Sequence, residues 1–361
     1  MHSVKFLGAF FLLAGLLGEA LPIRAEELSQ RTELLIFASG EVRGFDGGQP
    51  FVESDNLLLS ADLLGTWTRG RWHALAEVLL TTDEQELERL QLGWEPVPDT
   101  FLWIGRFHQP GSIWNTRQHH GQYLQPSITR PAIENWEDEG GVLPQHVEGL
   151  LFESRRPLGA RRGVALSAGV GISAQLKDGA LEPMKLFNPR NNDRLPSYSM
   201  QIAFLPDLTE DDAVGLLASH NELAFDPLPR SDGYDHVDLE VLGCYLDIGR
   251  GRWQLTSTAY AVHAKVSGAL AAAEDRFLAG YLQLQYQLDG GLTALARLEA
   301  TGGTADSAYL VLFPGFVEGR SVLDLRWDFA PRQALSLELA DTHAPRKDYR
   351  ELRIQWSAAL P

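Results

Sequence analysis

The feature that most constrains this chain is a period-two alternation of apolar and polar residues, repeated in segment after segment. Between residues 281 and 300, for example, Leu282, Leu284 and Leu288 alternate with glutamines, and a turn at 289–291 leads into a second run of the same kind. Such alternation places apolar side chains on one face of a β-strand and polar ones on the other, whereas a helix would repeat every ~3.6 residues. The pattern therefore predicts an all-β protein.

The length and number of these segments favour a membrane barrel. From Glu33 onward the chain contains about sixteen of them, each of roughly nine to twelve residues, near the length that a tilted strand needs to cross a bilayer. Short turns such as 249–252 alternate with longer polar connections such as 174–196, as in barrels whose tight turns all lie on one side. We therefore expect a transmembrane antiparallel β-barrel of about 16 strands. A secreted β-sandwich binding protein shows the same alternation and is the alternative, although its strands are usually only about five or six residues long.

Aromatic residues mostly fall near the ends of these segments, beside the turns. Side chains at such places form the interfacial girdles of membrane barrels. The residues concerned are Trp67, Trp72, Trp94, Trp103, Trp253, Trp327, Phe329 and Trp356.

The N-terminus has the composition of a secretory signal peptide. A basic start ends at Lys5, an apolar run follows at 6–17, and small residues lie at Gly18 and Ala20 or at Ala25. We expect residues 1–25 to be a signal peptide and residues 26–361 to form the barrel. The only cysteine, Cys244, excludes an internal disulfide and a cysteine-based zinc cluster. The net charge of −17 makes nucleic acid an improbable partner.

The stretch from 105 to 146 is the longest without a clean period, and it concentrates polar chemistry. Its histidines, arginines and acidic residues are His108, His119, His120, His146, Arg106, Arg117, Arg130, Glu137, Asp138 and Glu139. Three interpretations stay open: polar lining and loop packing, contact with a solute or ion, and a metal or haem site. The adjacent His119 and His120 would point to opposite sides of an extended backbone, so their spacing is weak evidence for a metal. No common catalytic or phosphate-binding motif occurs, so no catalytic residue, metal or cofactor is predicted, and an enzyme is the less favoured class.

The chain resembles the bacterial general and phosphate-selective porins in three features. These are the signal peptide, the number of strands and this long connection between the fifth and sixth strands. The local sequences "GRFHQPGSIWN", "SITRP" and "EDEGG" also resemble those of porin-like proteins. The resemblance implies that the connection, 108–145, folds into the lumen and narrows the channel. It also implies a homotrimer in the outer membrane of a Gram-negative cell. No ladder of arginine and lysine is evident, so phosphate is not assigned.

Strand parity completes the set of candidate lining residues. If Phe101, Trp103 and Phe107 face outward, Arg106 and His108 face the lumen. The candidates for the constriction are Arg106, His108, Arg117, His119, His120, Arg130, Glu137, Asp138, His146, Arg297, Asp324 and Arg326. The same parity adds Asp62, Glu77, Arg89, Glu299 and Arg353 as further candidates for the inner wall. The predicted function is passive diffusion of small hydrophilic solutes or ions, with these solutes and outer-membrane lipid as partners. A substrate-specific uptake barrel that uses the histidine-rich loop to bind metal or haem is the alternative.

Overall fold

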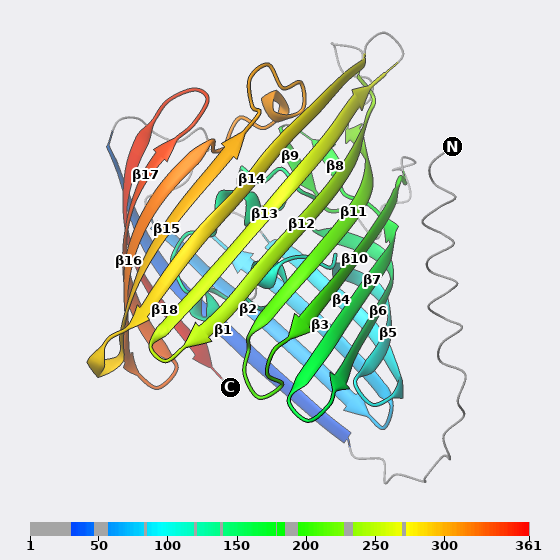
Figure 1. The fold of residues 1–361 in the computed structure, drawn as a ribbon, viewed down its shortest axis with the longest axis vertical. Helices are drawn as coiled ribbons and strands as arrows, with labels where there is room; N and C mark the ends of the chain where they lie inside the picture. Colours follow the sequence, from blue (N-terminus) through cyan, green and yellow to red (C-terminus); the bar gives the residue numbers. More distant parts are fainter. Residues whose placement is uncertain are drawn as a thin grey trace.

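The barrel is a single sheet that closes on itself, because the last strand pairs with the first (Figure 1). The computed structural model describes residues 30–46, 57–82, 85–118, 121–137, 140–177, 179–184, 194–226, 234–268 and 272–360. Within them, sixteen strands are long and two, β8 and β9, have three residues each. The prediction of an antiparallel barrel of about sixteen strands is confirmed, and the described residues do not form the two separate sheets of a sandwich.

Most neighbours in the sheet are neighbours in the chain, as in an up-and-down barrel. The long strands are β1 (Gln30–Asp46), β2 (Leu57–Arg69), β3 (Trp72–Thr81), β4 (Gln85–Val97), β5 (Thr100–His108), β6 (His146–Leu158), β7 (Arg162–Ile172), β10 (Pro196–Leu205), β11 (Ala213–Asp226), β12 (His236–Arg250), β13 (Trp253–Ser267), β14 (Ala272–Gln287), β15 (Leu292–Gly302), β16 (Gly319–Ala330), β17 (Gln333–His343) and β18 (Tyr349–Leu360). The short elements are β8 (Gln175–Lys177), β9 (Ala180–Glu182), η2 (Trp114–Gln118), η3 (Gln122–Leu124), η4 (Ala132–Glu134), η5 (Asp289–Gly291) and η6 (Leu310–Leu312). None of the helices in the described ranges is long and apolar enough to cross a membrane.

The strands are two-faced, as their alternation predicts. On β16, Leu323 and Leu325 are 61% and 42% exposed, whereas Asp324 between them is only 5% exposed. On β17, Leu337 is exposed and its neighbour Glu338 is fully buried. In a closed barrel the exposed leucines form an outer surface that suits lipid, and the acidic residues lie on the inner wall.

Short turns join the strands at one end of the barrel, which we call the turn end. Gly70, Gly251 and Gly290 occupy these turns with φ between 60° and 75°, a conformation that glycine adopts without steric cost. Longer connections lie at the opposite end, which we call the loop end. Parts of these connections, and residues 1–29 with the expected signal peptide, lie outside the described residues, so the signal peptide stays a prediction.

Aromatic side chains surround the turn end on the outer surface. Trp72 and Trp94 are partners in the β3–β4 register. The exposed aromatic residues at this end are Trp72, Trp94, Phe204, Trp253, Trp327, Phe329 and Trp356. Trp103 differs, because it is partly buried and its Nε1 donates a hydrogen bond of 2.9 Å to Glu153. The ring of exposed aromatics fits one interface of a bilayer.

Charged side chains mark a second border toward the loop end. Glu240, His263 and Arg276 are register partners on the outer face of β12, β13 and β14, and Glu240 Oε2 lies 3.2 Å from His263 Nδ1. Leu278 on the same face of β14 is exposed and apolar. On β13, ten residues separate His263 from the aromatic border at Trp253, within the ~9–11 residues that a barrel strand needs to cross the hydrocarbon region.

The prediction of which β5 side chains face outward is wrong. Leu102 and Ile104 are the exposed side chains of this strand, whereas Phe107 is fully buried and packs in one cluster with Trp103. The expectation assigned the aromatic residues to the lipid interface, but their rings are better buried against other side chains of the inner wall. After Gly105, whose φ is 135°, the alternation ends, and Arg106, Phe107 and His108 are all buried.

Candidate functional site

The connection from β5 to β6 lies inside the barrel and follows its inner wall over its described residues, 109–118, 121–137 and 140–145. It begins and ends at register partners, His108 and His146. Near its middle, Gly121 packs against the ring of Phe37 on β1, so closely that a Cβ at this glycine would lie 2.2 Å from a ring atom. The connection therefore extends from one part of the wall to another, as the resemblance to porins implied. We call residues 109–145 the inner loop.

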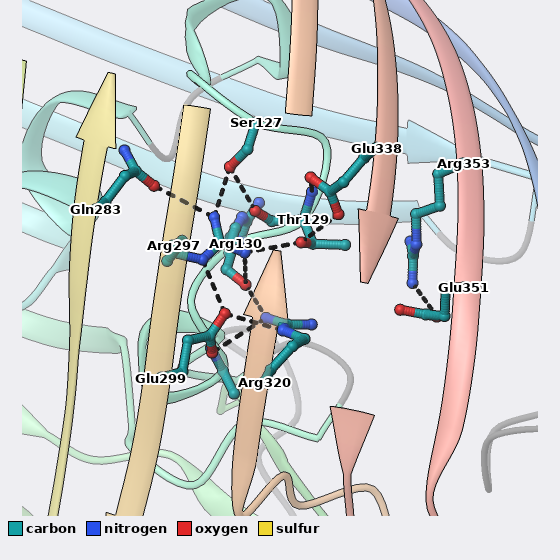
Figure 2. A network of polar contacts seen from close by, with 11 residues as sticks. Ser127, Thr129, Arg130, Gln283, Arg297, Glu299, Arg320, Glu338, Glu351 and Arg353 are labelled. Carbon is teal, nitrogen blue, oxygen red and sulfur yellow. Dashed lines mark hydrogen bonds and ion pairs between the residues drawn. The ribbon is translucent and has the colours of Figure 1, made fainter. Parts of the chain in front are cut away.

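Arg297 of β15 holds the inner loop by hydrogen bonds (Figure 2). Its Nη1 donates to Ser127 Oγ at 2.6 Å, and its Nη2 donates to Thr129 Oγ1 at 2.8 Å. Thr129 in turn donates its hydroxyl to Glu338 Oε1 at 2.6 Å. The Arg297 side chain is fully buried, so it is a loop anchor and does not face a solute path.

Glu299 joins two arginines to the inner loop (Figure 2). Its Oε1 lies 2.8 Å from Arg297 Nε and 2.9 Å from Arg320 Nε, and its Oε2 accepts a 2.6 Å hydrogen bond from the backbone of Ala132. Arg320 also donates to the carbonyl of Arg130. Charge-assisted hydrogen bonds of this kind are about twice as strong as neutral ones, so they fix this part of the loop against β15 and β16.

Arg326 of β16 binds the loop a short distance away. Its Nη1 donates to the carbonyls of Tyr123 and Gln125, both at 2.9 Å. Its guanidinium carbon lies 4.9 Å from the centroid of the Tyr123 ring, a cation–π distance. Like Arg297, Arg326 is a loop anchor.

Apolar packing fills the lumen on the side of β11–β14, contrary to the expectation of a polar inner face throughout. Val237, Leu239 and Val241 point inward from β12 and are buried. They share one core cluster with the inner loop and with two other loop-end segments. The loop members are Ile113, Trp114, Ile133, Trp136, Val142, Leu143, Leu176, Leu181, Tyr309, Leu310, Leu312, Phe313 and Phe316. Loops that cover these strand ends supply the apolar partners that an open channel could not provide.

Glu134 is a buried acid within this packing. Tyr260 Oη lies 3.0 Å from its Oε2, and Trp136 Nε1 donates to the same oxygen at 3.0 Å. Burial raises the pKa of Glu134 to about 7, although hydrogen bonds from Ser112, Tyr260, Thr258 and Trp136 act in the opposite direction. Near neutral pH this carboxyl is therefore close to its titration point.

A cavity of about 480 Å³ lies between the inner loop and the walls of β1–β4 and β16–β18. It is lined by side chains of both charge signs. The acidic ones are Glu41, Asp62, Glu77, Glu88 and Glu351, and the basic ones are Arg43, Arg130, Arg320, Arg346, Lys347 and Arg353. Asp62, Glu77 and Glu88 come from the neighbouring strands β2, β3 and β4, so acidic side chains collect on one wall, where Arg89 Nε lies 2.6 Å from Glu77 Oε2.

The basic side of the cavity is held by ion pairs across the barrel closure. Arg353 of β18 lies 2.8 Å from Glu41 of β1 and 2.7 Å from Glu351. Arg43 Nε lies 3.3 Å from the same Glu41 oxygen. These pairs fix the positions of charged groups beside the cavity instead of leaving them to move freely.

Of the candidate residues, Asp62, Glu77, Arg130 and Arg353 line this cavity. Arg297, Asp324 and Arg326 lie under the inner loop. Arg117 reaches the turn end, where its Nη1 donates to the Asp211 carbonyl at 2.5 Å. His119, His120, Asp138 and Glu139 lie outside the described residues. The candidate residues predicted from the sequence did not include five that line the cavity: Glu41, Arg43, Glu88, Arg320 and Glu351. For Glu41 and Arg43 the signal was their alternation with the exposed Val42.

The remaining candidates converge where the inner loop leaves and re-enters the sheet. Arg106 Nε donates to Glu148 Oε1 at 2.8 Å. His108 and His146 approach within 3.1 Å through their Nε2 atoms, and both contact Glu88. Two imidazoles and a carboxylate with this convergence are suited to holding a metal ion.

Comparison with solved structures identifies the fold of the barrel. The sequence matches no protein-family model and no curated protein. Among solved structures it is similar to the anion-selective porin from Comamonas acidovorans, with 10% identity, a TM-score of 0.60, and coverage of 92% of this chain and 100% of that one. The chain has the porin fold. It is also similar to the outer membrane channel DcaP of Acinetobacter baumannii (11% identity, TM-score 0.57, 94% and 100% covered) and to Salmonella typhi OmpF in complex with daunomycin (11%, 0.57, 91% and 97%).

Proposed function

We propose that this protein is an outer-membrane channel for the passive diffusion of small hydrophilic solutes or ions. The observation that carries the proposal is the cavity of about 480 Å³ beside the inner loop, whose lining carries fixed charges of both signs. A porin fold gives such a cavity a route across a bilayer, and the proposal requires no chemical step.

Charged side chains of both signs around the cavity favour polar solutes. Asp62 and Glu77 line the β2–β3 side, where Glu77 is paired with Arg89. Arg43, Arg320 and Arg353 line the β1, β16 and β18 side, where Glu41, Glu299 and Glu351 are their ion-pair partners. A field across a narrow aqueous path orients the dipole of a passing solute and disfavours apolar ones. Zwitterions and small polar molecules are therefore the class of solute that this lining suits.

The inner loop confines the path to this side of the barrel. On the opposite side, the lumen near the loop end is filled by the apolar cluster that contains Trp114, Leu143 and Tyr309. Solutes would pass along the charged walls, because buried apolar side chains of the described residues occupy the other side. The loop thus acts as the constriction that the resemblance implied.

Localisation and assembly belong to the same proposal. Residues 1–25 would direct export, and the belt between the aromatic and charged borders would lie in the outer membrane. A homotrimer would match the trimer form of one similar structure, OmpT of Vibrio cholerae (10% identity, TM-score 0.54).

Single-channel recording in planar bilayers tests the proposal. The purified barrel should conduct, and a salt gradient should give a reversal potential that shifts toward anions in Asp62→Asn/Glu77→Gln and toward cations in Arg346→Gln/Lys347→Gln. Arg252→Gln, which alters an exposed pair with Asp289 at the turn end, is the matched control and should leave selectivity unchanged. A correctly folded barrel that does not conduct would contradict the proposal.

A further inference from the structure

A cluster of two histidines and one glutamate lies where the inner loop joins the sheet. His108 ends β5, His146 begins β6, and the two are register partners. Glu88 comes from β4, where Glu77 pairs with Arg89 and Val78 pairs with Leu87. Glu88 is thus the extra residue of a β-bulge, which re-aims its side chain. All three clustered side chains are buried.

The three potential ligand atoms form a nearly equilateral triangle. Glu88 Oε2 lies 3.1 Å from His146 Nε2 and 3.3 Å from His108 Nε2, and the two Nε2 atoms are 3.1 Å apart. Nitrogen and oxygen ligands at about 2.0–2.1 Å from a tetrahedral zinc ion lie ~3.3 Å from one another. The triangle therefore has nearly the dimensions of one face of such a coordination shell.

With Glu88 ionised, hydrogen bonds within the triangle leave two like groups facing each other. Each ring nitrogen directs either one lone pair or one N–H toward the shared space, and the oxygen of Glu88 is an acceptor when ionised. If only one histidine donates to Glu88, the Nε2 lone pair of the other histidine faces the carboxylate oxygen, and two acceptors repel each other. If both donate to Glu88, the two N–H groups of His108 and His146 meet. A cation at the centre of the triangle removes the conflict, because all three atoms then present lone pairs to it.

A carboxylate of the inner loop orients one of the rings. Glu137 Oε2 lies 2.7 Å from His146 Nδ1, and Glu137 Oε1 accepts backbone hydrogen bonds from Gln145 at 2.5 Å and from His146 at 2.8 Å. The Nδ1 proton is thereby fixed on the side of Glu137, which leaves Nε2 as the ligand atom. Histidine ligands of metals commonly have such a carboxylate partner, which also raises ligand basicity.

We propose that Glu88, His108 and His146 bind a divalent transition-metal ion of the zinc class, with Glu137 as a positioning residue. Glu88 also lines the charged cavity, so the cavity supplies a route for the ion. Imidazole and carboxylate ligands together suit Zn²⁺ better than Mg²⁺ or Ca²⁺, which prefer oxygen alone. A bound ion would tie both ends of the inner loop to β4 and add positive charge beside Asp62 and Glu77.

Metal binding to the folded, full-length barrel in detergent tests the inference. Titration calorimetry with ZnCl₂ should show one equivalent bound, and Co²⁺ should give the intense visible absorption of a tetrahedral complex. These two measurements use the unaltered protein, so they do not depend on whether a variant folds. Absence of stoichiometric Zn²⁺ binding to the folded barrel would overturn the proposal.

Variants then assign the ligands, with folding checked by heat-modifiability in gels. His146→Gln and Glu88→Gln should lose the bound equivalent, and Glu137→Gln should weaken affinity about 10–100-fold while retaining it. His119→Gln/His120→Gln is the matched control and should bind normally. A second group, His220, Glu222 and Asp238, also has ligand atoms close together. If His220→Gln rather than His146→Gln removes the ion, the assignment to the loop junction is wrong.

Discussion

Thr129 of the inner loop gives Glu338 of β17 two hydrogen bonds, one from its backbone N–H at 3.0 Å and one from its hydroxyl at 2.6 Å, across a sequence separation of 209 residues. A bidentate contact of this kind fixes both the position and the orientation of the loop backbone. It lies beside the contacts of Arg297 with Ser127 and Thr129 (Figure 2). The inner loop is therefore bound to the wall at its centre as well as at its two ends.

Removal of the central anchor should loosen the inner loop. We expect Arg297→Met to lower stability by about 3–5 kcal/mol, because it breaks a buried ion pair and leaves Glu299 with one arginine fewer. Guanidinium unfolding measures the loss, and single-channel traces should become noisier as the loop moves. The exposed pair of Arg252 and Asp289 provides the control, since Arg252→Gln should cost no more than ~1 kcal/mol. Equal effects of the two substitutions would contradict the anchoring role.

A charge on the outer face should impair membrane assembly. Leu284 and Leu325 are both exposed on the lipid-facing surface, and an arginine near the middle of the bilayer costs about 2–4 kcal/mol in a barrel. Leu284→Arg and Leu325→Arg should therefore reduce the heat-modifiable folded form in gels. Gln285→Arg, one residue away on the inner face, is the matched control. If Gln285→Arg and Leu284→Arg fold equally well, the outer surface is not a lipid surface.

The two ends of the barrel should differ in accessibility from outside intact cells. In a Cys244→Ala background, we expect Lys265→Cys at the loop end to react with a membrane-impermeant maleimide and Gly290→Cys at the turn end not to react. The reason is that long loops face outward and short turns face the periplasm in outer-membrane barrels. Both cysteines should react after lysis. Labelling of Gly290→Cys in intact cells would show that the turn end faces outward and that the predicted orientation is wrong.

Titration of Glu134 should make stability depend on pH. Burial raises its pKa from about 4.5 to about 7 in the folded chain, so between these values the folded form binds more protons than the unfolded form. Stability therefore falls as pH rises through this window, by up to about 3 kcal/mol above pH ~7, and the loss is absent below pH ~4.5. Guanidinium midpoints at pH 5 and pH 8 should differ less in Glu134→Gln than in the unaltered protein. Equal pH dependence of the two proteins would show that folding does not raise the pKa of Glu134.

The barrel could be predicted from sequence because its determinants are local and repeated. Alternation along β16, where Leu323 and Leu325 flank Asp324, separates the two faces of a strand without any knowledge of its partners. Strand length and alternating turn length are equally local. The parity of β5 failed because its aromatic residues suit both a lipid interface and an inner wall, and no local signal distinguishes them.

What the sequence by itself determined is the two-faced strand, its number and its length, because each depends on neighbours within a few residues. Only the tertiary structure decided which polar groups meet. The inner loop buries Arg297 and Arg326 as anchors, although parity alone placed them beside the path. His108 and His146 are 38 residues apart, and Glu88 and His146 are 58 apart, yet barrel closure, the bulge at Glu88 and the return of the inner loop bring them within hydrogen-bonding distance. Contacts of this kind depend on register and curvature, which no short stretch of sequence encodes.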